Sequence, residues 1–148
     1  MKTTFLKSIF ASFFVASIVI SCGPPPPPGL ETFNYAENNS PTMIFMDNPE
    51  ANASAKKIAG KSTTSSAVID IKLTSLAVGT YTLGAGTGNE FVYKKPGVSN
   101  PWTGLIGTIT ITTNSGGLLF GTFDIKGGTG IGSVNMMKGD FSDVIITP

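Results

Sequence analysis

The chain has 148 residues, with ten lysines and no arginine, nine acidic residues, no histidine and one cysteine, which gives a formal net charge of +1. Without histidine or a second cysteine, the usual zinc sites and the Ser/His and Cys/His nucleophile pairs are excluded. The balanced charge and the lack of arginine exclude a nucleic-acid-binding surface. We therefore expect no catalytic residue, no metal site and no cofactor, and we do not expect an enzyme.

The first 21 residues have the layout of a signal peptide. Lys2 and Lys7 precede a nearly uninterrupted run of apolar and small residues over 8–20. As a helix this run spans roughly 20 Å, which is less than the ~30 Å hydrocarbon core of a bilayer. Residues 1–21 are therefore predicted to form a signal-peptide helix that is removed, rather than a permanent membrane span.

The end of this segment, Val19-Ile20-Ser21-Cys22, resembles the lipobox of Bacteroidota-type lipoproteins. The resemblance implies cleavage between Ser21 and Cys22, with lipid, palmitate included, on the Cys22 thiol and the new amino terminus. Two or more acyl chains make a stable anchor, so the membrane is an expected partner. The alternative is that Cys22 is a spare thiol or a small buried residue of an ordinary secreted protein.

Residues 22–29 then join the anchor to the domain. The five prolines at 24–28 predict a polyproline II rod of roughly 15 Å, which would act as a spacer. In related lipoproteins, the signals for export to the cell surface look like short acidic or Lys-acidic runs just after the cysteine, and here Gly23 and the prolines stand in that place. We expect an outer-membrane lipoprotein on the periplasmic face.

The first part of the remaining segment, residues 30–148, is polar and mixed. Residues 43–46, Met-Ile-Phe-Met, are an apolar island that predicts one strand. Residues 47–66 are rich in Ala, Ser, Lys and Asn and have no apolar period, which predicts a long polar loop. A short helix over residues 51–58 is an alternative.

From residue 67 onward, apolar and polar residues alternate with period two, as in half-buried strands. Residues 67–76 predict one such strand. Residues 79–83 and 91–93, joined by a glycine-rich turn, predict a hairpin. A second hairpin turns at residues 114–117, and four residues are expected on the inner face of each of its strands: Leu105, Gly107, Ile109 and Ile111, then Leu119, Gly121, Phe123 and Ile125.

Two last strands are predicted at residues 133–137 and 141–146. Because no helical period is sustained after residue 30, short loops should join successive strands in an antiparallel meander. The predicted fold is a single all-β domain, monomeric, forming a sandwich or a strongly curved open barrel. A calycin-like closed barrel is the alternative.

Four motifs follow one another in this region: GTYTLG (79–84), GTITIT (107–112), GTFDI (121–125) and MKGDFSDV (137–144). In this order behind a lipobox, they resemble a family of small Bacteroidota-type lipoproteins of unknown function, with the pattern GTYxLG, GTIxIT, GTFxF and GxFxxV. The resemblance implies an all-β fold and an envelope location, and it supplies no catalytic residue. Asp124-Ile125 departs from the third motif.

Aromatic residues offer the best candidates for a binding surface. Trp102 lies in a proline-containing segment beside Tyr93, and Phe120 is expected on the polar face of its strand. Exposed aromatic residues commonly mark contacts with a protein or glycan partner. The alternative is that Trp102 covers one end of the core and Phe120 lies beneath residues 47–66.

Acidic residues allow two further interpretations that we consider weaker. Asp140 and Asp143 could join a backbone carbonyl around Ca²⁺, but their spacing fits no EF-hand loop. Asp70 and Glu90 could form a glycosidase pair, but nothing in the sequence fixes the distance between them.

The sequence therefore predicts a membrane-anchored lipoprotein of unknown biochemical activity, most simply a binding or accessory domain presented at the cell envelope. A small apolar-ligand carrier is the alternative, and it requires a closed calycin-like barrel with an interior cavity.

Overall fold

The structure, a computed structural model, describes residues 31–130 and 133–148. The signal peptide, the cleavage and lipidation site at Ser21 and Cys22, and the proline spacer lie outside the described residues and stay predictions. Within the described residues, no helix has the length and apolar character needed to cross a bilayer.

Over residues 31–130 and 133–148 the chain forms ten β-strands, which confirms the predicted all-β class. Their bounds are β1 Thr32–Glu37, β2 Ile44–Met46, β3 Asn48–Asn52, β4 Lys57–Lys61, β5 Val68–Lys72, β6 Gly79–Leu83, β7 Glu90–Lys94, β8 Trp102–Ser115, β9 Leu118–Thr129 and β10 Met136–Thr147.

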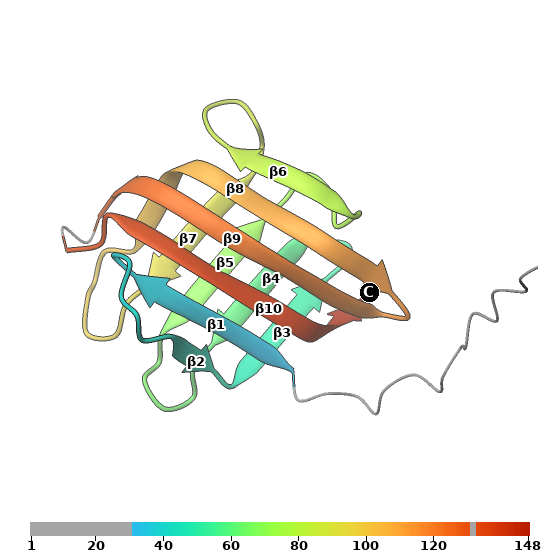
Figure 1. Ribbon diagram of the computed structural model, residues 1–148, viewed down its shortest axis with the longest axis horizontal. Helices are drawn as coiled ribbons and strands as arrows, with labels where there is room; N and C mark the ends of the chain where they lie inside the picture. The colour runs from blue at the N-terminus through green and yellow to red at the C-terminus, as the bar shows by residue number, and fades with distance from the viewer. Residues whose placement is uncertain (1–30, 131–132) are drawn as a thin grey trace, which may run out of the picture.

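The strands form two layers that close into a barrel. One layer runs β2-β1-β10-β9-β8-β6 and the other runs β3-β4-β5-β7. The end of β10 pairs with β3 and the start of β8 pairs with β7, so β3, β4, β5, β7, β8, β9 and β10 complete a closed ring of seven strands. Figure 1 shows the long strands of the first layer crossing steeply in front of the second. The strands form the closed barrel that the sequence allows as the alternative to a sandwich or an open barrel. The β3–β10 contact is parallel, whereas the predicted pairs are all antiparallel.

The predicted polar loop at residues 47–66 is wrong, because this segment contains the hairpin β3–β4, and the helix over 51–58 is absent. The three central residues of β4 are buried. Gly60 lies directly under Phe33 and Met46, since a Cβ there would come within 2.6 Å of the Met46 sulfur and 2.8 Å of the Phe33 ring. A strand with a glycine at an inward position is thus buried because large side chains of the opposite layer fill the space above that glycine.

The predicted hairpin between residues 79–83 and 91–93 is also wrong. β6 pairs with β8, while β7 pairs with β5. In the β5–β7 pair, Ile69 is opposite Tyr93 and Ile71 is opposite Phe91, and all four side chains are buried. Pairing two strands with the same apolar alternation buries both inner faces, and β6 is left to extend the other layer.

The two last predicted strands are one continuous strand, β10. Its register with β9 shifts between Phe141 and Val144, and Asp143 in this bulge has a φ of 55°. Because an extra residue is inserted, Phe141 and Val144 both face the interior although they are three positions apart.

The β8–β9 hairpin is confirmed, with Ser115 opposite Leu118. β8 changes direction at Gly107, where φ is +141° and a Cβ would collide with the backbone of Asp124. This corner changes which side chains point inward. Ile109 is buried as predicted, but Leu105, predicted on the inner face, is 50 % exposed.

Aromatic side chains fill the barrel. The ring centroids of Phe33 and Phe123 are 5.7 Å apart, those of Phe123 and Phe91 are 5.3 Å apart, and those of Phe91 and Trp102 are 6.0 Å apart. This continuous stack reaches from β1 in one layer to β7 in the other. The centre of the barrel is therefore a packed core of side chains.

Candidate binding site at the barrel mouth

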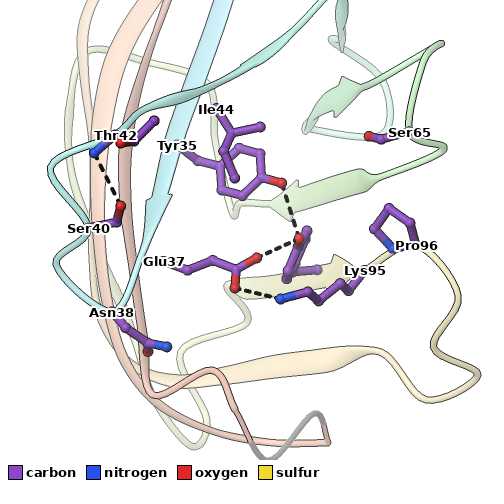
Figure 2. Close-up of a pocket in the computed structure, with 10 residues that line it drawn as sticks. Tyr35, Glu37, Asn38, Ser40, Thr42, Ile44, Ser65, Lys95 and Pro96 are labelled. Carbon is purple, nitrogen blue, oxygen red and sulfur yellow. Dashed lines mark hydrogen bonds and ion pairs between the residues drawn. The ribbon is translucent and has the colours of Figure 1, made fainter.

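Four side chains join the two layers at one end of the barrel. Tyr35 and Glu37 alternate along the inner face of β1, and Tyr93, on β7, precedes Lys95, which follows the strand end. Tyr93 donates a hydrogen bond of 2.8 Å to Glu37 Oε1, and Lys95 Nζ lies 2.8 Å from Glu37 Oε2. The Tyr35 and Tyr93 hydroxyls are 3.1 Å apart, and because Tyr93 gives its proton to Glu37, Tyr35 is the donor between them. Figure 2 shows this series of hydrogen bonds, and we call the four side chains the mouth network.

Burial keeps the mouth network in one protonation state. The side chains of Tyr35 and Tyr93 are 2 % and 1 % exposed. Burial raises the pKa of Tyr93 far above its ordinary value, and the hydrogen bond that Tyr93 donates to the Glu37 carboxylate raises it further. Burial also raises the pKa of Tyr35. Both phenols therefore stay neutral, and Tyr93 remains a donor that holds the Glu37 carboxylate in place.

A pocket of about 530 Å³ opens above the mouth network. Besides the network residues and Asn38, its walls consist of Ser40, Thr42, Ile44, Ser65 and Pro96. Figure 2 shows these side chains spread around Glu37 and Lys95, and they come from the β1–β2 connection, β2, and the loops after β4 and β7. The pocket thus combines hydroxyl groups and an ion pair with apolar wall, as small-molecule sites commonly do.

Specific hydrogen bonds fix the loops that form the rim. Asn38, in the left-handed conformation with φ of 53°, accepts the Asn135 amide at 2.8 Å and donates to the Ser133 carbonyl. Asp47 accepts hydrogen bonds from the Thr63 hydroxyl and, at 2.8 Å, from the Thr63 amide, and these bonds lower the pKa of Asp47. The β1–β2 connection and the β4–β5 loop are therefore held in place on opposite sides of the pocket.

The structure separates the three predicted aromatic candidates. Trp102 is 1 % exposed and packs edge-on against Phe91, so it belongs to the core and does not form an exposed contact surface. Tyr93 is also buried, but its hydroxyl reaches the pocket as part of the mouth network. Phe120 is half-buried on β9 and lines neither this pocket nor the second one described below. Of the three, only Tyr93 belongs to the candidate site.

Three of the four acidic residues named in the two weaker interpretations have other partners in the structure. Asp70 pairs with Lys57 at 2.8 Å, and Glu90 lies 3.7 Å from Lys72, so the two acids have different partners. Asp140 accepts a hydrogen bond of 3.1 Å from the Asn34 amide. Among residues 31–130 and 133–148, no three acidic or cysteine side chains gather in a way that could hold a metal ion.

A second, smaller concavity of about 370 Å³ lies on the outer face of β8, β9 and β10. It contains charged and hydroxyl side chains, among them Asp124, Lys138 and Thr108, and Met43 forms one wall. The outer face has no buried network comparable to that of the mouth pocket, because Thr108 and Asp124 are exposed. We therefore take the mouth pocket as the candidate site.

Sequence reasoning missed Tyr35, Glu37 and Lys95. A signal for each was present: Phe33, Tyr35 and Glu37 alternate, and Lys95 follows Phe91 and Tyr93 with the same period of two. Extending that alternation places Glu37 and Lys95 at the inner ends of their strands. Only the closure of the barrel brings these two strand ends together.

Comparisons with known proteins give a family without an assigned activity. The family model "Domain of unknown function (DUF6252)" matches residues 32–145, which include every strand except the last two residues of β10. No curated protein and no solved structure matches the chain. Any function must therefore be argued from the site itself.

Proposed function

The chain belongs to the DUF6252 family, and we propose that it is a small-molecule-binding domain tethered to an envelope membrane through lipid on Cys22. The observation that carries this proposal is the mouth network beneath a pocket of about 530 Å³. The volume falls in the range of ~300–1,000 Å³ typical of small-molecule sites. The domain acts as a monomer that binds and presents its ligand without chemical turnover.

The rigidity of the site supports a binding role. Both oxygens of Glu37 are engaged, one by Tyr93 and the other by Lys95. These hydrogen bonds connect opposite layers of a closed barrel whose centre is filled. A site held in this way loses little conformational entropy when a ligand binds, which favours affinity.

The direction of β1 supports presentation away from the membrane. The chain enters the barrel at Thr32, and β1 runs to Glu37 at the pocket, a rise of about 16 Å at ~3.3 Å per residue. In Figure 1 the β1–β2 connection lies toward the left end of the front layer, and β1 starts at the lower edge, at the opposite end of that strand. A tether attached before Thr32 would leave the pocket on the far side of the domain from the membrane.

Metabolic labelling with a palmitate analogue tests the tether. The full-length chain should incorporate the label and fractionate with the outer membrane, and Cys22→Ala should abolish both. Intact cells should protect the domain from added protease, because we place it on the periplasmic face. Absence of labelling, or equal labelling of the Cys22→Ala variant, would contradict the anchor.

Blocking the pocket tests the binding role. Compounds that raise the melting temperature of the wild-type protein should lose their effect in Ser65→Trp, which places an indole at the rim. Thr64→Trp is the matched control, since Thr64 is the exposed neighbour that does not line the pocket. Compounds that stabilise both variants equally would bind elsewhere and would remove the support for this pocket.

A small apolar-ligand carrier is the second candidate, because the barrel is closed and Ile44 and Pro96 contribute apolar wall. The aromatic stack fills the centre, so such a ligand would occupy the mouth alone. Organic extraction of protein purified from its native membrane should then release a stoichiometric lipid from the pocket, whereas a ligand held by the Glu37–Lys95 ion pair predicts none.

A further inference from the structure

The ion pair in the mouth network has hydrogen-bonding capacity left over. Glu37 accepts one hydrogen bond on each oxygen, and a carboxylate oxygen can accept more than one. Lys95 uses one of its three N–H groups on Glu37. The side chains of Glu37 and Lys95 are 16 % and 35 % exposed, so both reach the pocket. The pocket therefore offers an acceptor and a donor side by side.

The charge of this pair disfavours charged ligands. Glu37 and Lys95 neutralise each other at 2.8 Å. An acidic ligand that approaches Lys95 also approaches Glu37, and a basic ligand that approaches Glu37 also approaches Lys95. Displacing either partner would leave the other half-buried without its counter-charge, which is costly.

A hydroxyl group fits this pair, because it is neutral and donates and accepts at once. One ligand hydroxyl can donate to Glu37 while it accepts from Lys95. Three further hydroxyl side chains line the same pocket, those of Ser40, Thr42 and Ser65. A ligand that carries several hydroxyls on one face could use all of these groups.

The apolar part of the pocket narrows the class of ligand further. Ile44 is 40 % exposed and lies in the pocket wall near Tyr35, where it can cover the C–H face of a ring. The rings of Tyr35 and Tyr93 are almost fully buried, so they do not act as stacking platforms. Resting on the proposed function, we propose that the mouth pocket binds a neutral saccharide, with its hydroxyls on Glu37 and Lys95 and one ring face on Ile44.

A set of neutral, acidic and basic sugars, with one fatty acid, tests this inference on the wild-type protein. The probes are the methyl glycosides of glucose, galactose and mannose, together with glucuronate, glucosamine and octanoate, each at millimolar concentration. The readout is the NMR shift of the Ile44 methyl group and of the Ser65 and Lys95 amides. At least one neutral glycoside should shift these signals, with at least tenfold tighter binding than glucuronate or glucosamine.

The outcomes separate the ligand class from the proposed function. If octanoate or a charged sugar shifts the pocket signals and no neutral glycoside does, the saccharide inference is wrong and the binding pocket stands. If no probe shifts them, the saccharide inference and the small-molecule role of this pocket both fail.

Two variants test the contacts. Glu37→Gln and Lys95→Met each remove one charged partner of the ligand hydroxyl, so each should weaken binding of the neutral glycoside by about tenfold, the ratio for ~1.4 kcal/mol. Lys94→Met is the matched control, because Lys94 is exposed on the outer side of the same strand end. Thermal unfolding of each variant shows whether the barrel is intact. Unchanged affinity in both folded variants would overturn the inference.

Discussion

Replacing Tyr93 with phenylalanine tests the mouth network most simply. The ring would remain, including its contact with the Tyr35 ring at a centroid distance of 5.4 Å, so packing is conserved. The variant loses the hydrogen bond to the Glu37 carboxylate, and hydrogen bonds of this kind contribute about 1.5–3 kcal/mol. It also leaves the buried Tyr35 hydroxyl without its partner, at a cost of about 1 kcal/mol.

Together these two effects predict a loss of about 2.5–4 kcal/mol in the free energy of unfolding. For a domain of this size that corresponds to a fall in melting temperature of roughly 10 °C. Chemical denaturation of the wild type and of Tyr93→Phe measures the difference. Adding Tyr35→Phe to the Tyr93→Phe variant should lower the free energy of unfolding by less than Tyr35→Phe does in the wild type, because the Tyr35 hydroxyl has already lost its hydrogen-bond partner. A loss below about 0.5 kcal/mol, or fully additive effects, would refute the network.

Three further results follow from the structure. Above about pH 10 the unfolded chain loses tyrosine protons that folded Tyr35 and Tyr93 retain. The free energy of unfolding should therefore fall by about 1.4 kcal/mol per pH unit for each of these two tyrosines. Tyr93→Phe should make this fall with pH less steep when the free energy is measured by urea denaturation. Gly121→Ala should cost about 1–3 kcal/mol by calorimetry, because the new methyl group would overlap a core phenyl ring and a backbone carbonyl, and a neutral effect would contradict this close packing. The pKa of Asp47 is lowered in the folded state, so its hold on Thr63 should be complete above about pH 4 and lost as the pH falls further, with faster Thr63 amide exchange relative to its intrinsic rate. Constant Thr63 protection down to acid unfolding would contradict that assignment.

Much of the fold could be predicted from the sequence where one strand face is apolar and the other polar. Residues 67–76 and the β8–β9 hairpin show this pattern, and their inner faces are buried as predicted after Gly107. β3 and β4 could not be predicted in this way. Apart from Ile58 their buried residues are small, and Gly60 is buried because Phe33 and Met46 reach across from the other layer. Such burial depends on tertiary contacts that no local pattern contains.

The candidate site was predictable only in part for the same reason. Tyr93 was chosen as a candidate, but for an exposed surface, whereas it acts through a buried hydroxyl. Glu37 and Lys95 are 58 positions apart in the chain, and only barrel closure brings them together. Trp102 was misleading because a proline-containing segment with polar neighbours resembles an exposed loop, while its indole packs into the end of the core.

The proposed function requires a small molecule to bind at the barrel mouth, above the Tyr35–Tyr93–Glu37–Lys95 network. The most direct test is a crystal structure of residues 29–148 soaked with a library of small polar fragments. Fragments should bind against Glu37 and Lys95, with the aromatic centre of the barrel unoccupied. Fragments that collect on the outer face of β8–β10 or within the barrel centre, with none at the mouth, would contradict the proposed function.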